Sequence, residues 1–197
     1  SLLGNAGFDM IGVDNSVDML QIAREKTSPE FLYLLQDMRE FEPGEKVSAV
    51  VSACDSINYI LEPEDLQAVF FCVSESLKEG GIFIFDINTP YKYEVLMADN
   101  TIAENRDEGS FIWDNYYDAD EKINEYDLTL FIKEQSEDED DIYKKFEETH
   151  FQRCYEISEL KELLEQSGLV FDAVYDAYTD DQVKCDSEKV TVIAHKA

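Results

Sequence analysis

Four short apolar segments that alternate with amphipathic ones constrain the fold of this chain most strongly. They cover residues 8–14, 31–37, 47–56 and 82–88. Each is apolar on both faces and carries a polar group at its end, whereas residues 16–26 and 63–81 show the apolar stripe of a helix. Strands that are buried on both faces and alternate with helices predict a doubly wound, mostly parallel α/β sheet of the Rossmann-like class.

Capping residues mark the expected helices between these strands. The helix predicted over 16–26 begins at Ser16, a residue type that caps helix N-termini. A second helix is predicted over 63–81, with Pro63 in its first turn and Gly80 as its C-terminal stop.

The rest of the chain, residues 89–197, divides into an insert and a return to the core. Residues 89–155 alternate with period two and predict an antiparallel β insert after the fourth strand. Within it, the acidic run QSEDEDD at 135–141 is expected at a hairpin tip. A helix over 156–167 then precedes two strands, 169–178 and 189–196, which are close enough in sequence to pair antiparallel at an edge. We therefore expect residues 1–88 and 156–197 to form one core.

Charge and composition restrict the partners of this protein. Its 45 acidic and 16 basic residues give a net charge of −29, which disfavours nucleic acid and anionic lipid because both are bound mainly through Lys and Arg. Four scattered cysteines without a CxxC pair, and only two histidines, predict reduced thiols in a cytoplasmic protein and no metal site. The sequence favours a small-molecule substrate, with no nucleic acid and no membrane as partner, and leaves the oligomeric state open.

Acidic residues end two of the predicted strands and suggest a ligand. Ligands of open parallel sheets bind outside the carboxyl ends of the strands. Asp14 is suited to accept both ribose hydroxyls of a nucleotide-like cofactor, although it is equally suited to cap the helix that follows. A second acid, Asp37, favours the ligand interpretation, because it can receive an adenine amino group while the Met38 amide meets a ring nitrogen.

Several motifs resemble a known family. The stretches GFDMIGVDNSVDMLQIAREK, LLQDMREF and SLKEGGIFIFDINTPYK resemble the class I S-adenosylmethionine (SAM)-dependent methyltransferases. The order of CDSINYI, NTPYK, SFIWD and EETHFQRCY resembles their small bacterial YqeM-like branch. The resemblance spans essentially the whole chain and implies SAM as cofactor.

One departure from the family concerns the front of the chain. The family's first strand and the glycine-rich loop after it have no counterpart, since no GxGxG occurs and SLLGNAG resembles the end of the helix that follows that loop. In the family's strand order, 3-2-1-4-5-7-6, the first strand is central. Its absence predicts two half-sheets with unpaired edges and an N-terminally incomplete sequence.

The resemblance implies roles for individual residues. Asp14 resembles the ribose-binding acid, with Asn15 and Met19 lining the adenosine, and Asp37 and Met38 resemble the adenine contacts. The stretch that begins at Cys54 follows the strand beside the sulfonium methyl group.

In such an enzyme we expect the insert, residues 89–155, to lie over the active site as a substrate cover. Residues that contact the substrate or remove its proton are therefore expected around it. Four residues are candidates for binding the substrate: Asn58, Tyr59, Arg153 and Trp113. His150, Tyr91 and Asp55 are candidates for the chemistry, Asp55 as electrostatic support for a cation. The alternatives are structural, since Asp55 suits a turn, His150 suits a satisfied strand position and Trp113 suits packing between insert and core.

The sequence thus predicts a SAM-dependent methyltransferase that acts on a small-molecule acceptor by in-line displacement. A nicotinamide-dependent oxidoreductase is one alternative, since an acid after such a strand also binds the ribose of NAD. A non-catalytic module that binds SAM or a protein partner is the other.

Overall fold

The computed structural model describes residues 2–134 and 141–197 and contains three sheets. The largest part of the core is a four-stranded sheet of β3 (Val47–Ser52), β4 (Leu77–Asn88), β10 (Lys189–Lys196) and β9 (Leu169–Asp176), in the order β3-β4-β10-β9. β3 and β4 are parallel, and β10 is antiparallel to both of its neighbours. The predicted antiparallel pairing of the last two strands is confirmed, with β9 at the edge and β10 inside the sheet.

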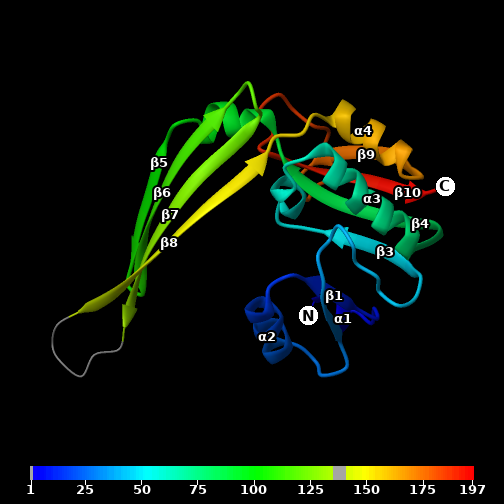
Figure 1. The fold of residues 1–197 in the computed structure, drawn as a ribbon, viewed down its shortest axis with the longest axis horizontal. Coiled ribbons are helices and arrows are strands. Elements are labelled where there is room, and N and C mark those ends of the chain that lie inside the picture. The colour runs from blue at the N-terminus through cyan, green and yellow to red at the C-terminus, as the bar shows by residue number, and fades with distance from the viewer. Residues whose placement is uncertain (1, 135–140) are drawn as a thin grey trace.

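Two helices cover one face of this sheet (Figure 1). They are α3 (Pro63–Ser76) and α4 (Ile157–Gln166), whose apolar stripes pack on Phe83 and Phe85 of β4 and Val192 of β10. On the opposite face Val51 is 54% exposed and Ile82 is 44% exposed. The main hydrophobic core therefore lies between the sheet and the α3–α4 layer, where apolar burial stabilises the fold.

The prediction of two half-sheets is confirmed. β1 (Ile11–Asp14) and β2 (Leu32–Leu35) form a separate parallel pair, preceded by α1 (Leu2–Asn5) and connected through α2 (Val17–Lys26). Among the described residues, no strand is hydrogen-bonded to the remaining edge of β1 or of β3. Ser16 caps α2 as predicted, since its hydroxyl accepts the Met19 N–H at 3.3 Å.

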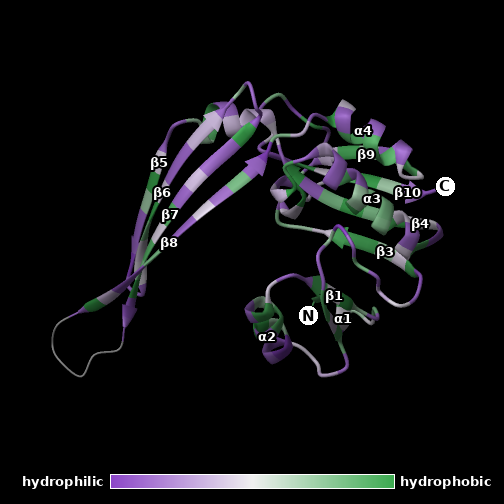
Figure 2. Cartoon of the chain, in the orientation of Figure 1, coloured by the Kyte–Doolittle hydropathy of each residue, from purple (hydrophilic) through white to green (hydrophobic). Residues whose placement is uncertain are grey.

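The insert is an antiparallel meander that extends away from the core (Figure 1). Its strands are β5 (Thr101–Arg106), β6 (Gly109–Asp118), β7 (Ile123–Glu134) and β8 (Ile142–Arg153). Hydrophilic and hydrophobic residues intermingle along these strands, whereas β10 and much of β4 are more uniformly hydrophobic (Figure 2). Most of the acidic run expected at a hairpin tip, residues 135–140, lies outside the described residues.

Three features of the core and the insert were not predicted from the sequence. The helix expected over 63–81 ends at Ser76, because Leu77 adopts an extended conformation and pairs with Val47 of β3. β5 and the π-helix η2 (Lys92–Met97) were also not predicted. No helix within 2–134 and 141–197 is long and apolar enough to cross a membrane.

Candidate functional site

A left-handed turn after β3 forms the centre of the candidate site. Cys54 and Asp55 follow one another with φ values of 62° and 52°, a conformation that is costly for residues with a Cβ atom. Their N–H groups both donate to the carboxylate of Asp86, at 3.2 Å from Cys54 and 2.9 Å from Asp55. Asp86 lies near the end of β4. It therefore holds the turn that follows β3, the strand beside β4.

The carboxylate of Asp86 is buried and shared by four donors. Its residue is 2% exposed, and besides the two backbone N–H groups it accepts a hydrogen bond from the Tyr178 hydroxyl. Lys189 Nζ lies 3.3 Å from it and 2.7 Å from Asp55 Oδ1. A buried carboxylate is costly unless it is paired and hydrogen-bonded, and these donors meet that condition.

Asp55 is ionised within this cluster. Burial alone raises the pKa of its carboxyl group, but the hydrogen bonds from Lys189 and from Gln152 Nε2 at 2.8 Å outweigh it, and the pKa is lowered. The nearby ammonium group of Lys92 donates to Asn88 Oδ1 at 2.9 Å, and burial lowers its pKa. Two lysines, Lys189 and Lys92, therefore lie close to Asp55 and favour its ionised form.

Asn58 is buried and links three segments of the chain by hydrogen bonds. It is fully buried, its side-chain amide donates to the Arg153 carbonyl at 2.8 Å, and its Oδ1 accepts the Asn88 N–H at 3.0 Å. These hydrogen bonds join η1 (Ser56–Tyr59) to the ends of β4 and β8. The side chain of Asn58 is thus buried within the protein, and its predicted contact with the substrate stays a prediction.

An aromatic cluster joins the insert to η1. The hydroxyls of Tyr59 and Tyr126 are 2.6 Å apart, and His150 stacks on Tyr126 with ring centroids 4.7 Å apart. Trp113 packs on the other side with its centroid 4.8 Å from that of Tyr126, and its buried indole N–H has no partner among the described residues. Tyr59, Trp113 and His150 are therefore brought together as a wall of the candidate site.

Two predicted residues lie apart from this cluster. Arg153 points to the other side of β8, where it donates to the Leu61 carbonyl at 3.3 Å and pairs with Glu159 at 3.2 Å. Tyr91 lines a separate cavity of about 240 Å³ with Ile87 and other residues. The alternation of β8 explains the position of Arg153, because successive side chains point to opposite faces.

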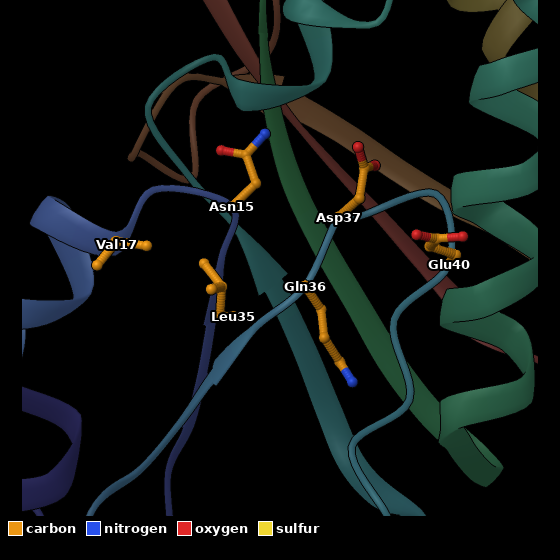
Figure 3. Close-up of a pocket in the computed structure, with 6 residues that line it drawn as sticks. All are labelled: Asn15, Val17, Leu35, Gln36, Asp37 and Glu40. Carbon is orange, nitrogen blue, oxygen red and sulfur yellow. The ribbon is translucent and has the colours of Figure 1, made fainter.

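A polar cavity lies between the carboxyl ends of β1 and β2 (Figure 3). It measures about 410 Å³ and is lined by Asn15, Val17, Leu35, Gln36, Asp37 and Glu40. Asn15 and Asp37, which come from different strand ends, are thus brought to one cavity as predicted for a ligand at this edge.

The other residues predicted at the adenosine, Asp14, Met19 and Met38, do not line this cavity. Asp14 Oδ1 accepts the Ser16 N–H at 2.8 Å, so the acid organises the start of α2, and its second oxygen has no partner among the described residues. Met19 is 55% exposed on α2, and Met38 packs against the main core.

Asp37 is held by an arginine two residues away. Arg39 donates to both of its carboxylate oxygens, at 3.0 Å and 2.7 Å, and these hydrogen bonds lower the pKa of Asp37. Arg39 also pairs with Asp65 of α3 at 2.9 Å. An ionised acceptor therefore stands at the edge of the cavity.

The sequence analysis missed four polar residues of the site: Lys92, Gln152, Tyr178 and Lys189. Lys189 and Tyr178 come from the chain around the β9–β10 connection, more than 120 residues from Asp55. The one available signal was Gln152, which shares a strand face with His150.

Comparison with known proteins identifies relatives of the chain. Residues 1–81 match a family model described as "Methyltransferase domain". The Bacillus subtilis (strain 168) protein named "Putative methyltransferase YqeM" is 32% identical over 198 residues, covering 99% of this chain and 78% of that protein. The dTDP-3-amino-3,4,6-trideoxy-alpha-D-glucopyranose N,N-dimethyltransferase of Streptomyces venezuelae is 34% identical over 95 residues, covering 48% of this chain and 38% of that protein.

A solved structure is also similar. The crystal structure of a SAM-dependent methyltransferase from Clostridium acetobutylicum ATCC 824 superimposes with a TM-score of 0.87 at 28% identity. The match covers 96% of this chain and 76% of that chain. The similarity therefore extends over both the core and the insert.

Proposed function

Because these relatives show that the chain belongs to the SAM-dependent methyltransferase family, we propose that it methylates a small-molecule acceptor by in-line displacement. The cluster at the ends of β3 and β4 carries the proposal. There the strained turn at Cys54 and Asp55 is bound to Asp86, and Gln152 of the insert donates to Asp55.

The cofactor side of the proposal uses the cavity between β1 and β2. Its polar lining fits an adenosine group, because the Asp37 carboxylate and the Asn15 amide offer hydrogen-bonding atoms at one edge. We propose that the free oxygen of Asp14 receives the ribose, that Met19 borders the adenosine, and that the Met38 backbone contributes to the adenine contact. When bound, SAM supplies an activated methyl group on a sulfonium.

The acceptor side uses the turn and the insert. Cys54 lies where the backbone borders the sulfonium, and the Asp55 carboxylate supports a positive charge beside it. Tyr59 and Trp113 border the acceptor, and His150 takes part in removing its proton. Residues 89–155 serve as the cover that excludes water, and residues 1–88 with 156–197 serve as the SAM-binding core.

The choice of a small acceptor rests on charge and on a relative. A net charge of −29 disfavours polyanionic partners, and the Streptomyces venezuelae relative is named for a nucleotide-linked aminosugar. The family membership argues against the nicotinamide alternative. A non-catalytic module would bind SAM without transferring its methyl group, so a measurement of methyl transfer separates that alternative from the proposal.

Calorimetry with SAM, S-adenosylhomocysteine and NAD tests the cofactor half of the proposal. We expect binding of the first two, weakened by Asp14→Asn, with Asp18→Asn on the exposed first turn of α2 as a matched control. Turnover is then measured with methyl-labelled SAM and a panel of small amines and hydroxyl compounds, including dTDP-3-amino-3,4,6-trideoxy-alpha-D-glucopyranose. Preferential NAD binding contradicts the proposal, and SAM binding without turnover on the whole panel favours a non-catalytic module.

A further inference from the structure

The aromatic cluster contains a continuous chain of hydrogen bonds that ends at the protein surface. Tyr126 and Tyr59 share their hydroxyls at 2.6 Å, the Tyr59 hydroxyl lies 3.3 Å from His150 Nδ1, and His150 Nε2 lies 3.2 Å from Glu148 Oε2. The chain begins at Tyr126, which is 8% exposed, and ends at Glu148, whose side chain is 57% exposed. It therefore connects a buried hydroxyl to solvent.

The partners of His150 determine the direction of these hydrogen bonds. A carboxylate only accepts hydrogen bonds, so Nε2 carries the imidazole proton and donates it to Glu148. In the neutral ring Nδ1 is then an acceptor, and the Tyr59 hydroxyl donates to it. Because the Tyr59 hydroxyl donates its own hydrogen to Nδ1, its oxygen acts only as an acceptor towards other groups. It accepts a hydrogen bond from the Tyr126 hydroxyl and can accept one more. The same arrangement orients a histidine base in catalytic triads.

Of the hydrogen-bonded residues, Tyr59 is nearest in sequence to the proposed point of methyl transfer, and it is 41% exposed. Tyr59 is the last residue of η1, which begins directly after Asp55. Gln152 is two residues from His150 on the same face of β8 and donates to Asp55 Oδ2 at 2.8 Å. The strand face that carries His150 thus also carries a side chain that contacts the turn.

Resting on the proposed function, we propose that Tyr59, His150 and Glu148 relay a proton from the acceptor to solvent. The acceptor class is then a primary or secondary amine or a hydroxyl compound, because only an N–H or O–H group has a proton to lose. Its lone pair forms the bond to the methyl carbon, and the electron pair of the broken carbon–sulfur bond stays on sulfur. The surplus proton passes to the Tyr59 oxygen as Tyr59 gives its own proton to Nδ1 of His150. The resulting imidazolium is stabilised by Glu148 and releases a proton to water.

The groups that face His150 fit this assignment. They are Tyr59 from η1, Tyr126 from β7 and Glu148 from β8, with Asp55 beyond Gln152. Burial and the hydrogen bond with Tyr59 raise the pKa of Tyr126, so Tyr126 stays neutral and leaves the proton to the histidine. Trp113 of β6 packs on Tyr126 with ring centroids 4.8 Å apart, whereas His150 lies on β8, the strand on the other side of β7.

Nitrogen NMR of histidine-labelled protein tests the relay without any acceptor. The chain has only two histidines, and the second, His195, bonds Asp172. We expect neutral His150 to carry its proton on Nε2, Tyr59→Phe to shift the Nδ1 signal, and Glu148→Gln to shift the Nε2 signal. Asp172→Asn is the matched control and must change only His195. A proton on Nδ1 of neutral His150, or variants that leave its signals unchanged, overturns the proposal.

A kinetic arm separates this proposal from the proposed function. With any panel acceptor that wild type methylates, Glu148→Gln and Tyr59→Phe should lower kcat about 100-fold at neutral pH and shift its pH profile, with SAM affinity kept. Turnover with an unchanged pH profile in both variants overturns the relay but leaves the methyltransferase proposal intact. Methylation confined to acceptors that lack an N–H or O–H proton also overturns it.

Discussion

Replacing Asp86 by Asn tests whether one buried carboxylate holds the turn at the centre of the site. The carboxylate accepts the N–H groups of Cys54 and Asp55 at 3.2 Å and 2.9 Å and lies 3.3 Å from Lys189 Nζ. Asparagine has the same shape but only one acceptor oxygen, so its NH₂ group must face a backbone N–H or the ammonium. A donor then opposes a donor inside the protein.

The expected cost follows from the bonds that are lost. A hydrogen bond to a charged group contributes about 1.5–3 kcal/mol, and Asp86→Asn weakens two or more of them. Lys189 keeps its ion pair with Asp55 at 2.7 Å, which limits the penalty of leaving a buried cation unpaired. We expect a loss of about 3 kcal/mol in the free energy of unfolding, or a fall of about 6–12 °C in Tm for a chain of this size.

Urea unfolding and SAM calorimetry measure this prediction together. The left-handed conformation of Cys54 and Asp55 costs about 1–3 kcal/mol per residue and persists only while the surroundings enforce it. Affinity for SAM should therefore fall as well as stability. Asp172→Asn, whose carboxylate is exposed and bonds His195, is the control and should cost less than about 1 kcal/mol. An Asp86→Asn protein as stable as this control would refute the argument, as would an unchanged SAM affinity.

Three further predictions concern the charges and the core. Lys189→Met should raise the lowered pKa of Asp55. Because a depressed carboxyl pKa adds stability only above the unfolded value of about 3.9, the unfolding free energies of variant and wild type should differ most near neutral pH and converge in acid. Burial raises the pKa of Cys154 to about 11, so at pH 8 iodoacetamide should modify the exposed Cys185 at least about tenfold faster, and equal mass-spectrometric labelling would contradict this. Leu164→Ala should cost about 2–5 kcal/mol in thermal unfolding, since Leu164 is fully buried between α4 and the sheet, and a cost below 1 kcal/mol would contradict that packing.

Patterns local in sequence predicted most of the fold. The apolar strands, the Ser16 cap and the stripe of α4 are all determined by residues within a few positions of one another. The missing partner between β1 and β3 was instead predicted from the family resemblance, because the family's first strand and glycine-rich loop have no counterpart here. The end of α3 was predicted wrongly, because pairing of Leu77 with β3 outweighed the local stop signal at Gly80.

Of the candidate site, the sequence indicated the strand ends but not the contacts between them. Asp37 was predicted near the ligand from its place at a strand end, whereas the role of Asn15 was implied only by the family resemblance; both residues line one cavity. Asn58 and Arg153 were predicted at the substrate, yet their side chains bond internal carbonyls and the neighbouring helix. Sequence spacing gives no information about which hydrogen bonds a polar side chain completes once it is buried.

The sequence by itself thus determined the class of sheet, the acids at its edge and the face of β8 that carries His150. Only the tertiary structure determined that Lys189 pairs with Asp55, that Asp86 holds the turn and that Tyr59 reaches His150. The physical reason is that periodicity is a local property of the backbone. These contacts instead join segments 31 to 134 residues apart, which only the packing of the whole fold brings together.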